Sequence, residues 1–198
     1  IPSVVILTSY FLSLWGGSIR FNTPMLFALA FLPMFGIGGL TGLPLGLAAT
    51  DIYLHDTYYV IGHFHYVVAP GTIFALFAGI YYWFPKITGK KMNEMLGKLH
   101  FWPSLIFMNG IFLPMFIQGL AGVSRRLADG GESYAHASGV LHLNEFMTTS
   151  AFLLGIAQIP FIINIIMSLF SGEKTGRNPW NATTVEWAAP SPPLPHVN

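Results

Sequence analysis

The sequence predicts an all-α membrane protein, a bundle of transmembrane helices with four full spans and one partial span. Of the 198 residues, 53% are hydrophobic and only 9% are charged, whereas about a quarter of the residues of a soluble domain are charged. In addition, four apolar runs are each long enough to cross a bilayer, which takes about 20 helical residues.

Each element follows from the order of apolar and polar stretches. Residues 1–15 are too short to cross comfortably, so we interpret them as the end of a helix. Because the chain opens inside this apolar run without an initiator Met, we expect a fragment or the second half of a longer chain. Residues 1–171 then form a helical bundle, and the proline-rich, polar residues 172–198 a cytoplasmic-side tail with little regular structure. The full spans are expected at residues 24–49, 58–84, 100–122 and 143–170.

The basic residues predict the orientation of the bundle. If successive helices alternate, seven of the nine Lys and Arg residues fall on one side of the bilayer. An excess of basic residues marks the cytoplasmic side, so Arg125 and Arg126 lie on the outer side against the rule. The net charge of +1 excludes nucleic acid as a partner, because no basic cluster is large enough to follow a phosphate backbone.

Glycines recur at four-residue spacing in the span 24–49, at Gly38, Gly42 and Gly46. Small residues in this pattern form a smooth helix face and let helices approach closely in lipid. Helix packing is therefore the interpretation that we favour for them.

Three histidines and an aspartate interrupt the apolar run LHDTYYVIGHFHYVVAPG, residues 54–71. Titratable groups in a membrane helix usually mark an ion path, a metal or a cofactor, and without cysteine a metal must use His, Asp, Glu or backbone oxygen. His63 and His65 are separated by about 200° of rotation, so their imidazoles face opposite sides of a helix. Such a pair cannot easily share one metal, but it can serve two separate centres with Phe64 between them.

Polar residues also gather at the outer boundary. A neutral imidazole beside a carboxylate, as in His55 and Asp56, suits a hard divalent cation or an anionic cofactor group bridged by water. Arg125 and Arg126, at the same level on another helix, offer forked donors for carboxylates.

Each of these features also has a simpler structural interpretation. A lone buried histidine is more often a hydrogen-bonded core residue than a ligand, and Asp56 could cap a helix by accepting hydrogen bonds from nearby amides. The two arginines could snorkel to lipid phosphate or pair with Asp129 and Glu132. The conjunction of all these features in the outer half of one small bundle favours a functional site.

Several runs together resemble one family. The run HDTYYVIGHFHYVVAPG, followed by WFPKITGKKMNEMLGKLHFW, is similar to the tenth and eleventh helices of haem-copper oxidase subunit I, the catalytic subunit of cytochrome c oxidase. The runs GGLTG, GLAGVSRR and NPWNATTVEWAAPSPPLPH are similar to the same subunit in the same order. The resemblance covers essentially the whole chain, from late helix eight to helix twelve and the carboxyl terminus of a twelve-helix fold.

The resemblance implies a role for each histidine and aspartate of the central run. His63 matches the proximal ligand of the high-spin haem iron, where oxygen is reduced, and His65 an axial ligand of the low-spin haem. Phe64 would lie between the two haems. His55 and Asp56 match a magnesium site that a carboxylate of subunit II completes.

The resemblance also explains why two arginines breach the charge rule. Arg125 and Arg126 match the pair that binds haem propionates, and Asp51 is expected in the same propionate cluster. One departure concerns Ile6, which stands where many members carry a proton-conducting lysine. This puts the usual second proton channel in doubt.

The implied activity is the reduction of O2 to water with electrons from cytochrome c, coupled to proton translocation. The implied cofactors are two haems of the a/a3 type, a copper whose histidine ligands lie outside this chain, and magnesium. The implied partners are the remainder of subunit I, subunits II and III, and cytochrome c or another electron donor acting through subunit II. The chain alone cannot complete the catalytic centre.

Four other interpretations compete with this one. A quinol-fed oxidase differs mostly in subunit II, and a non-catalytic haem-binding or assembly fragment would keep the histidines without the reaction. Nitric oxide reductase is less suitable, because that branch is not expected to carry HDTYY before the histidines, and a plain transporter leaves the His-Phe-His pair unexplained. The tail indicates a prokaryotic plasma membrane in preference to the mitochondrial inner membrane.

Overall fold

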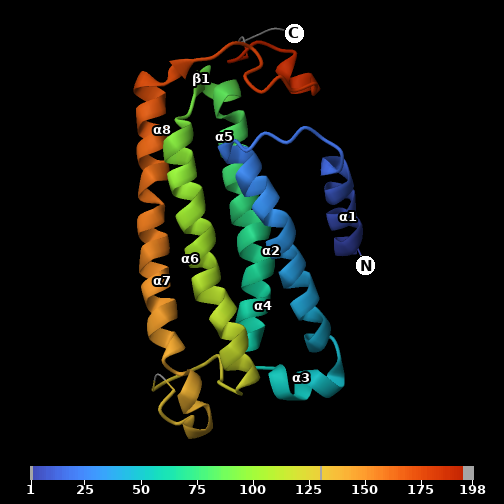
Figure 1. Ribbon diagram of the computed structural model, residues 1–198, viewed down its shortest axis with the longest axis vertical. Coiled ribbons are helices and arrows are strands. Elements are labelled where there is room, and N and C mark those ends of the chain that lie inside the picture. The colour runs from blue at the N-terminus through green and yellow to red at the C-terminus, as the bar shows by residue number, and fades with distance from the viewer. Residues whose placement is uncertain (1, 130, 194–198) are drawn as a thin grey trace.

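The computed structural model describes residues 2–129 and 131–193, which form a bundle of long helices lying side by side (Figure 1). The predicted fold class is confirmed: four helical segments are long and apolar enough to cross a membrane, and one shorter apolar helix accompanies them. The segments are Thr23–Leu45, Tyr58–Thr88, Glu94–Leu120 and Leu143–Ser171, with Pro2–Leu14 as the shorter helix.

Two of the four segments are built from more than one helical element. The second consists of α4 (Tyr58–Val68), the π-helical turn η1 (Ala69–Phe74) and α5 (Ala75–Thr88), and the fourth of α7 (Leu143–Ala157) and α8 (Ile159–Ser171). The others are α2 (Thr23–Leu45) and α6 (Glu94–Leu120), with α6 packed between α4 and α7. The short helix α1 (Pro2–Leu14) stands beside α2, away from the other helices (Figure 1).

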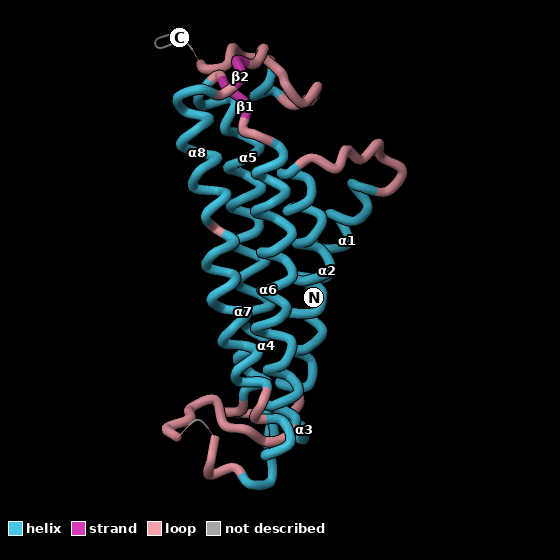
Figure 2. Tube along the Cα trace, turned by 60° about the vertical axis from the view of Figure 1, so that its left-hand side comes forward, coloured by secondary structure: helices cyan, strands magenta, loops and turns pink. Residues whose placement is uncertain are grey.

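Short elements lie at the two ends of the bundle (Figure 2). We call the end that carries the antiparallel strands β1 (Lys90–Lys91) and β2 (Glu173–Lys174) the inner end, after the predicted orientation. The outer end carries α3 (Ala48–Leu54) and the 3-10 helix η2 (Ala135–Val140). The described part of the tail, residues 172–193, folds over the inner end and includes the 3-10 helix η3 (Val185–Trp187).

Prolines account for the two irregular points in the long segments. Pro70 has no amide hydrogen and clashes with the preceding turn, and η1 begins at its neighbour Ala69. The π-helical distortion therefore lies just beyond His63 and His65 in the chain. Pro160 lies two residues after Gln158, the single residue between the end of α7 and the start of α8.

Polar side chains at the inner end set where α2 and α6 begin. Asn22 caps α2 by accepting a hydrogen bond from the amide of Met25 at 3.1 Å, and Glu94 of α6 accepts one from the amide of Thr23 at 2.6 Å. Asn93 caps α6 itself through the amide of Leu96 at 3.0 Å. Such bonds satisfy amides that a helix leaves unpaired, so α6 begins at Glu94, before the expected start of the span at His100.

Glycines allow the central helices to touch. A Cβ on Gly38 of α2 would lie 2.9 Å from the backbone of Tyr66 and Val67 in α4, and a Cβ on Gly119 of α6 would fall onto the backbone of Tyr59. Both contacts require glycine, because no other residue leaves room for the neighbouring main chain. The packing interpretation of the glycine spacing is therefore correct for Gly38.

A buried polar cluster ties α5, α6 and the α7–α8 junction together in the inner half of the bundle. His100 is 0% exposed, and its ring nitrogens lie 3.2 Å from the hydroxyl of Tyr81 and 3.0 Å from the side-chain oxygen of Gln158. The side-chain amide of Gln158 also donates to the hydroxyl of Ser104 at 3.1 Å. Because an unpaired polar group is costly in an apolar setting, these bonds explain how a histidine can lie among the rings of Phe27, Phe77 and Phe161.

The close contact at Gly119 gives a direct test of this packing. We expect Gly119→Ala to lower the melting temperature and the yield of the assembled complex, since overpacking against backbone costs about 1–3 kcal/mol or more. Gly36→Ala is the matched control, because a Cβ on Gly36 meets nothing within 4 Å and alanine favours a helix. Equal melting temperatures for the two variants would contradict the packing described for α4 and α6.

Candidate functional site

His63 projects from α4 towards α2. Its Nδ1 lies 2.9 Å from the carbonyl oxygen of Gly38 and 3.3 Å from the hydroxyl of Thr41. A carbonyl can only accept, and the hydroxyl of Thr41 itself donates to the carbonyls of Ile37 and Gly38, so Nδ1 carries the hydrogen. The lone pair is then on Nε2, the state that a histidine needs to bind a metal.

Gly42 makes room for this imidazole. A Cβ at this position would lie 2.7 Å from Cε1 and 3.3 Å from Nε2 of His63. Gly42 therefore leaves space for the ring of His63, whereas Gly46 is the C-cap of α2.

His65 projects from the other side of α4, towards α6. Its Nδ1 lies 2.9 Å from the carbonyl oxygen of Ile61, which again leaves the lone pair on Nε2. The imidazole stacks on the ring of Phe112 of α6 at 4.3 Å, with 13° between the planes. The two histidines contact different helices, as the predicted rotation between them requires, and the half-exposed Phe64 lies between them in sequence.

The outer end of α4 is joined to the loop after α6 by backbone pairing. Thr57 and Ser124 form an isolated antiparallel bridge, the amide of Tyr58 donates to Val123 at 3.0 Å, and the amide of Arg125 donates to Asp56 at 2.9 Å. This pairing brings together two sequence segments that were predicted to lie at the same level of the membrane.

Asp56 and Arg125 form an ion pair at this junction, with 2.6 Å between the guanidinium and the carboxylate. The carboxylate of Asp56 is thus paired, and Thr57 is the residue whose side chain caps α4, by accepting from the amide of Tyr59 at 3.2 Å. The alternative of Asp56 as a helix cap is wrong. Asp56 has φ of 58°, in the left-handed region that aspartate tolerates better than most residues.

The two arginines differ in their surroundings. The Nε of Arg125 is buried and lacks a hydrogen-bond partner among the described residues, whereas the side chain of Arg126 is exposed. A buried donor without an acceptor is costly, so an anionic group next to Arg125 fits this site.

Asp129, which could have paired with the arginines, forms a turn of its own. Its carboxylate accepts hydrogen bonds from the hydroxyl and amide of Ser133 and from the amide of Gly131. The bond from the Ser133 hydroxyl, followed by those from the two amides, holds the pKa of Asp129 below its usual value. For Arg125, the structure therefore shows Asp56 as the partner in place of Asp129.

His55 is exposed and ends α3, and its Nδ1 lies 2.7 Å from the carbonyl oxygen of Asp51. The side chain of Asp51, expected near haem propionates, belongs to the first turn of the same short helix. Within residues 2–129 and 131–193, no three His, Asp or Glu side chains come together as a complete metal site. Any cation held by His55 and Asp56 needs further ligands from another chain or from water.

Sequence reasoning missed the groups that orient the histidines. The carbonyls of Gly38 and Ile61 cannot be read from side-chain identity, and no sequence pattern singled out Phe112. For the carbonyl of Gly38, the sequence signal was the glycine spacing in α2. That spacing indicated that another helix packs closely against α2, but it did not show which helix or which side chain.

Comparisons with known proteins identify the family of the chain. The sequence profile of the family described as "Cytochrome C and Quinol oxidase polypeptide I" matches residues 1–153. The chain is 48% identical over 194 residues to cytochrome c oxidase subunit 1 of Synechocystis sp., covering 98% of this chain and 34% of that protein. It is 43% identical over 198 residues to alternative cytochrome c oxidase subunit 1 of Bradyrhizobium diazoefficiens, covering 100% of this chain and 34% of that protein.

A solved structure shares the fold. The cryo-EM structure of a heme-copper terminal oxidase dimer matches with a TM-score of 0.63 and 22% identity, over 77% of this chain and 28% of that one. The chain thus spans about a third of the length of its curated relatives. Both named relatives are bacterial, in agreement with the prediction of an integral membrane protein of prokaryotic origin.

The helical bundle, the divergent histidines of α4 and the sequence matches lead to one conclusion: the chain belongs to the cytochrome c and quinol oxidase polypeptide I family, that is, subunit I of the haem-copper oxidases.

Proposed function

We propose that this chain is the carboxyl-terminal part of the catalytic subunit of a terminal respiratory oxidase, which reduces O2 to water and couples the reaction to proton translocation. The observation that carries the proposal is the pair of imidazoles on one helix, each with Nδ1 held by a backbone carbonyl and Nε2 left with its lone pair. Two irons on opposite sides of one helix need ligands of this kind.

In this proposal His63 holds the high-spin haem and His65 the low-spin haem, and the two haems are of the a/a3 type. The haems supply one-electron transfer and, at the high-spin iron, the position where oxygen is reduced together with a copper bound by other parts of the subunit. The contribution of this chain is to fix the direction of both imidazoles. Phe64, one residue from each ligand, lies in the gap between the two groups.

The outer junction would neutralise the propionates. Arg125 offers a buried Nε without a partner, and Arg126 offers an exposed guanidinium for a second carboxylate. Asp51 is proposed to hydrogen-bond in the same propionate cluster; its backbone carbonyl lies 2.7 Å from Nδ1 of His55.

His55 and Asp56 are proposed to hold magnesium together with a carboxylate of subunit II. This chain offers only two ligands for the ion, as expected for a site that two subunits share. Hard oxygen ligands and water suit this ion.

Cytochrome c is the electron donor that we propose, acting through subunit II, with subunit III and the remainder of subunit I completing the complex. The family description includes quinol oxidases, but the relatives named above are cytochrome c oxidases. A copper-binding cysteine cluster in the partner subunit would favour cytochrome c, and its absence would favour quinol.

The ligand roles can be tested by difference spectra of the purified complex, reduced minus oxidised, with and without carbon monoxide. We expect His63→Ala to remove the carbon-monoxide-binding haem and His65→Ala to remove the low-spin band. His136→Ala is the control, because His136 lies in the outer 3-10 helix η2 and its loss should leave the spectra unchanged. Wild-type spectra in both ligand variants would overturn the proposed function.

The role of Gly42 gives a finer test of ligand orientation. Gly42→Ala places a methyl group against the ring of His63, so we expect a shifted carbon-monoxide difference spectrum and about a tenfold or greater loss of turnover, because small misplacements of reacting groups are costly. Gly39→Ala in the same helix meets nothing within 4 Å and should behave as the parent. If both variants match the parent, Gly42 does not position the imidazole.

The cation site can be tested separately from catalysis. In complex prepared from cells grown with manganese, we expect Asp56→Asn to abolish or broaden the electron paramagnetic resonance signal of a protein-bound Mn2+ ion. Asp129→Asn, which changes another outer carboxylate, should keep that signal. An unchanged signal in Asp56→Asn would show that the cation does not bind there.

A further inference from the structure

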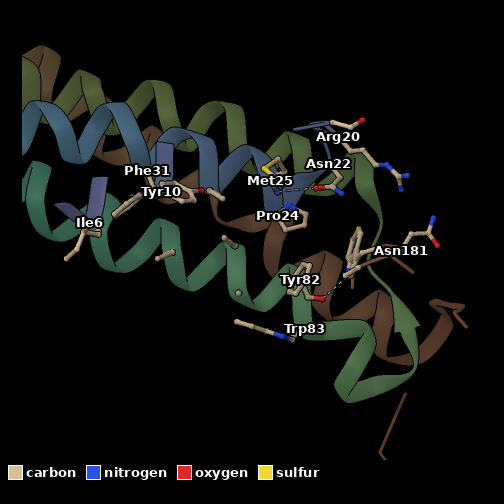
Figure 3. A pocket seen from close by; sticks show the side chains of 18 residues that line it. Ile6, Tyr10, Arg20, Asn22, Pro24, Met25, Phe31, Tyr82, Trp83 and Asn181 are labelled. Carbon is tan, nitrogen blue, oxygen red and sulfur yellow. Dashed lines mark hydrogen bonds between the residues drawn. The ribbon is translucent and has the colours of Figure 1, made fainter. Parts of the chain in front are cut away.

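A cavity of about 820 Å³ opens between α1, α2 and α5 in the inner half of the bundle (Figure 3). The part of its lining farther from the inner end is apolar and aromatic, with Ile6 and Tyr10 of α1 and Phe31 of α2. Its inner rim is more polar, with Arg20, Asn22 and Asn181. The rim therefore includes a residue of the tail, which is remote in sequence from every helix of the cavity.

Three consecutive tail residues, Trp180, Asn181 and Ala182, line this cavity. A closed turn presents them. The side chain of Asn178 donates to the carbonyl of Ala182 at 2.6 Å and accepts from its amide at 2.9 Å. Asn181 has φ of 53°, a conformation that asparagine adopts more readily than most residues.

One residue of α5 anchors the tail at two points. The indole N–H of Trp180 donates to the carbonyl of Tyr82 at 2.9 Å, and the indole N–H of Trp187 donates to the hydroxyl of Tyr82 at 2.9 Å. Trp180 stacks on the ring of Tyr82 at 5.9 Å, and Trp187 meets the same ring edge-on at 5.4 Å. Trp187 is only 2% exposed, so it is a core residue although it belongs to the tail.

Lysines of the inner end strengthen this attachment. Lys86 donates to the carbonyls of Ala189 and Pro190 at 2.8 and 3.0 Å, and its ammonium group lies 5.6 Å from the ring of Trp187. The ammonium group of Lys91 lies 5.6 Å from the ring of Trp180. Cation–π contacts of this kind add to the hydrogen bonds.

We propose that residues 177–190 form a strap that closes the inner end of the cavity, with Trp187 as its anchor and the turn 178–182 as its cover. Tyr82 lines the cavity and accepts from Trp180 through its carbonyl and from Trp187 through its hydroxyl, so loss of the anchor removes one of the two attachments of the strap to Tyr82. The strap then controls how readily water and solutes from the inner side reach Ile6 and Tyr10. The proposal concerns access to the cavity and does not depend on the haems or on oxidase activity.

The test uses a single introduced thiol, since the chain has no cysteine. Ala28 lines the cavity from α2, and Ala28→Cys would be labelled in membrane vesicles with the inner face outward by a membrane-impermeant maleimide. The label is read on this chain by mass spectrometry, so that thiols of other subunits do not interfere. Gly176→Cys, outside the strap and with no atom near its Cβ, measures unrestricted labelling.

We expect slow labelling of Ala28→Cys in the otherwise unchanged complex. Adding Trp187→Ala should raise the rate by about tenfold or more, because a buried, hydrogen-bonded aromatic anchor is lost. Adding Tyr82→Phe, which removes only the hydroxyl that accepts from Trp187, should raise it by about fivefold, the factor expected for one net hydrogen bond. Trp15→Ala, at an exposed tryptophan of the α1–α2 connection, should leave the rate unchanged.

Two results would overturn the strap. In one, Ala28→Cys is labelled as fast as Gly176→Cys in the otherwise unchanged complex, so that the inner end is already open. In the other, neither Trp187→Ala nor Tyr82→Phe raises the rate. Tyr82→Phe keeps the aromatic ring, and it decides the question alone if Trp187→Ala does not assemble.

Discussion

The hydrogen bond between Nδ1 of His63 and the carbonyl oxygen of Gly38 is the interaction on which the site depends. It fixes which ring nitrogen keeps its lone pair, and it requires α2 and α4 to lie in close contact. That contact exists because Gly38 presents no side chain to the backbone of α4 and Gly42 presents none to the imidazole. The orientation of the imidazole and the helix packing are therefore linked: a side chain at Gly38 would meet the backbone of α4, and one at Gly42 would meet the imidazole of His63.

The other buried polar side chains also have hydrogen-bond partners, which a polar group needs in an apolar medium. His65 uses the carbonyl one turn earlier in its own helix, and His100 uses a phenol and an amide from neighbouring segments. The exception within the described residues is at the outer junction, where Nε of Arg125 and a side-chain oxygen of Gln118 are buried without partners. In the proposed function the first of these serves an anionic group, which gives the orphaned donor an acceptor.

Much of the fold and the direction of the site residues followed from the sequence. Apolar runs predicted the spans, and the helical period predicted that His63 and His65 diverge, because both depend on local chemistry alone. The sequence did not show that Glu94 accepts a hydrogen bond from the amide of Thr23 at the start of α2, because the two residues lie 71 positions apart in the chain. The ion pair of Asp56 with Arg125 and the attachment of the tail to Tyr82 depend in the same way on tertiary contacts, which side-chain identity and periodicity do not encode. Thr57 as the cap of α4 was readable, because threonine is a better cap than the residues that follow it.

The most direct measurement is a cryo-EM map of the complex that contains this chain, at a resolution that shows ring planes. The account predicts two tetrapyrrole densities on opposite sides of α4, one bonded to Nε2 of His63 and the other to Nε2 of His65. Both Nδ1 atoms should remain within hydrogen-bond distance of the carbonyls of Gly38 and Ile61. A map in which either imidazole binds no metal, or both bind the same metal, would contradict the account.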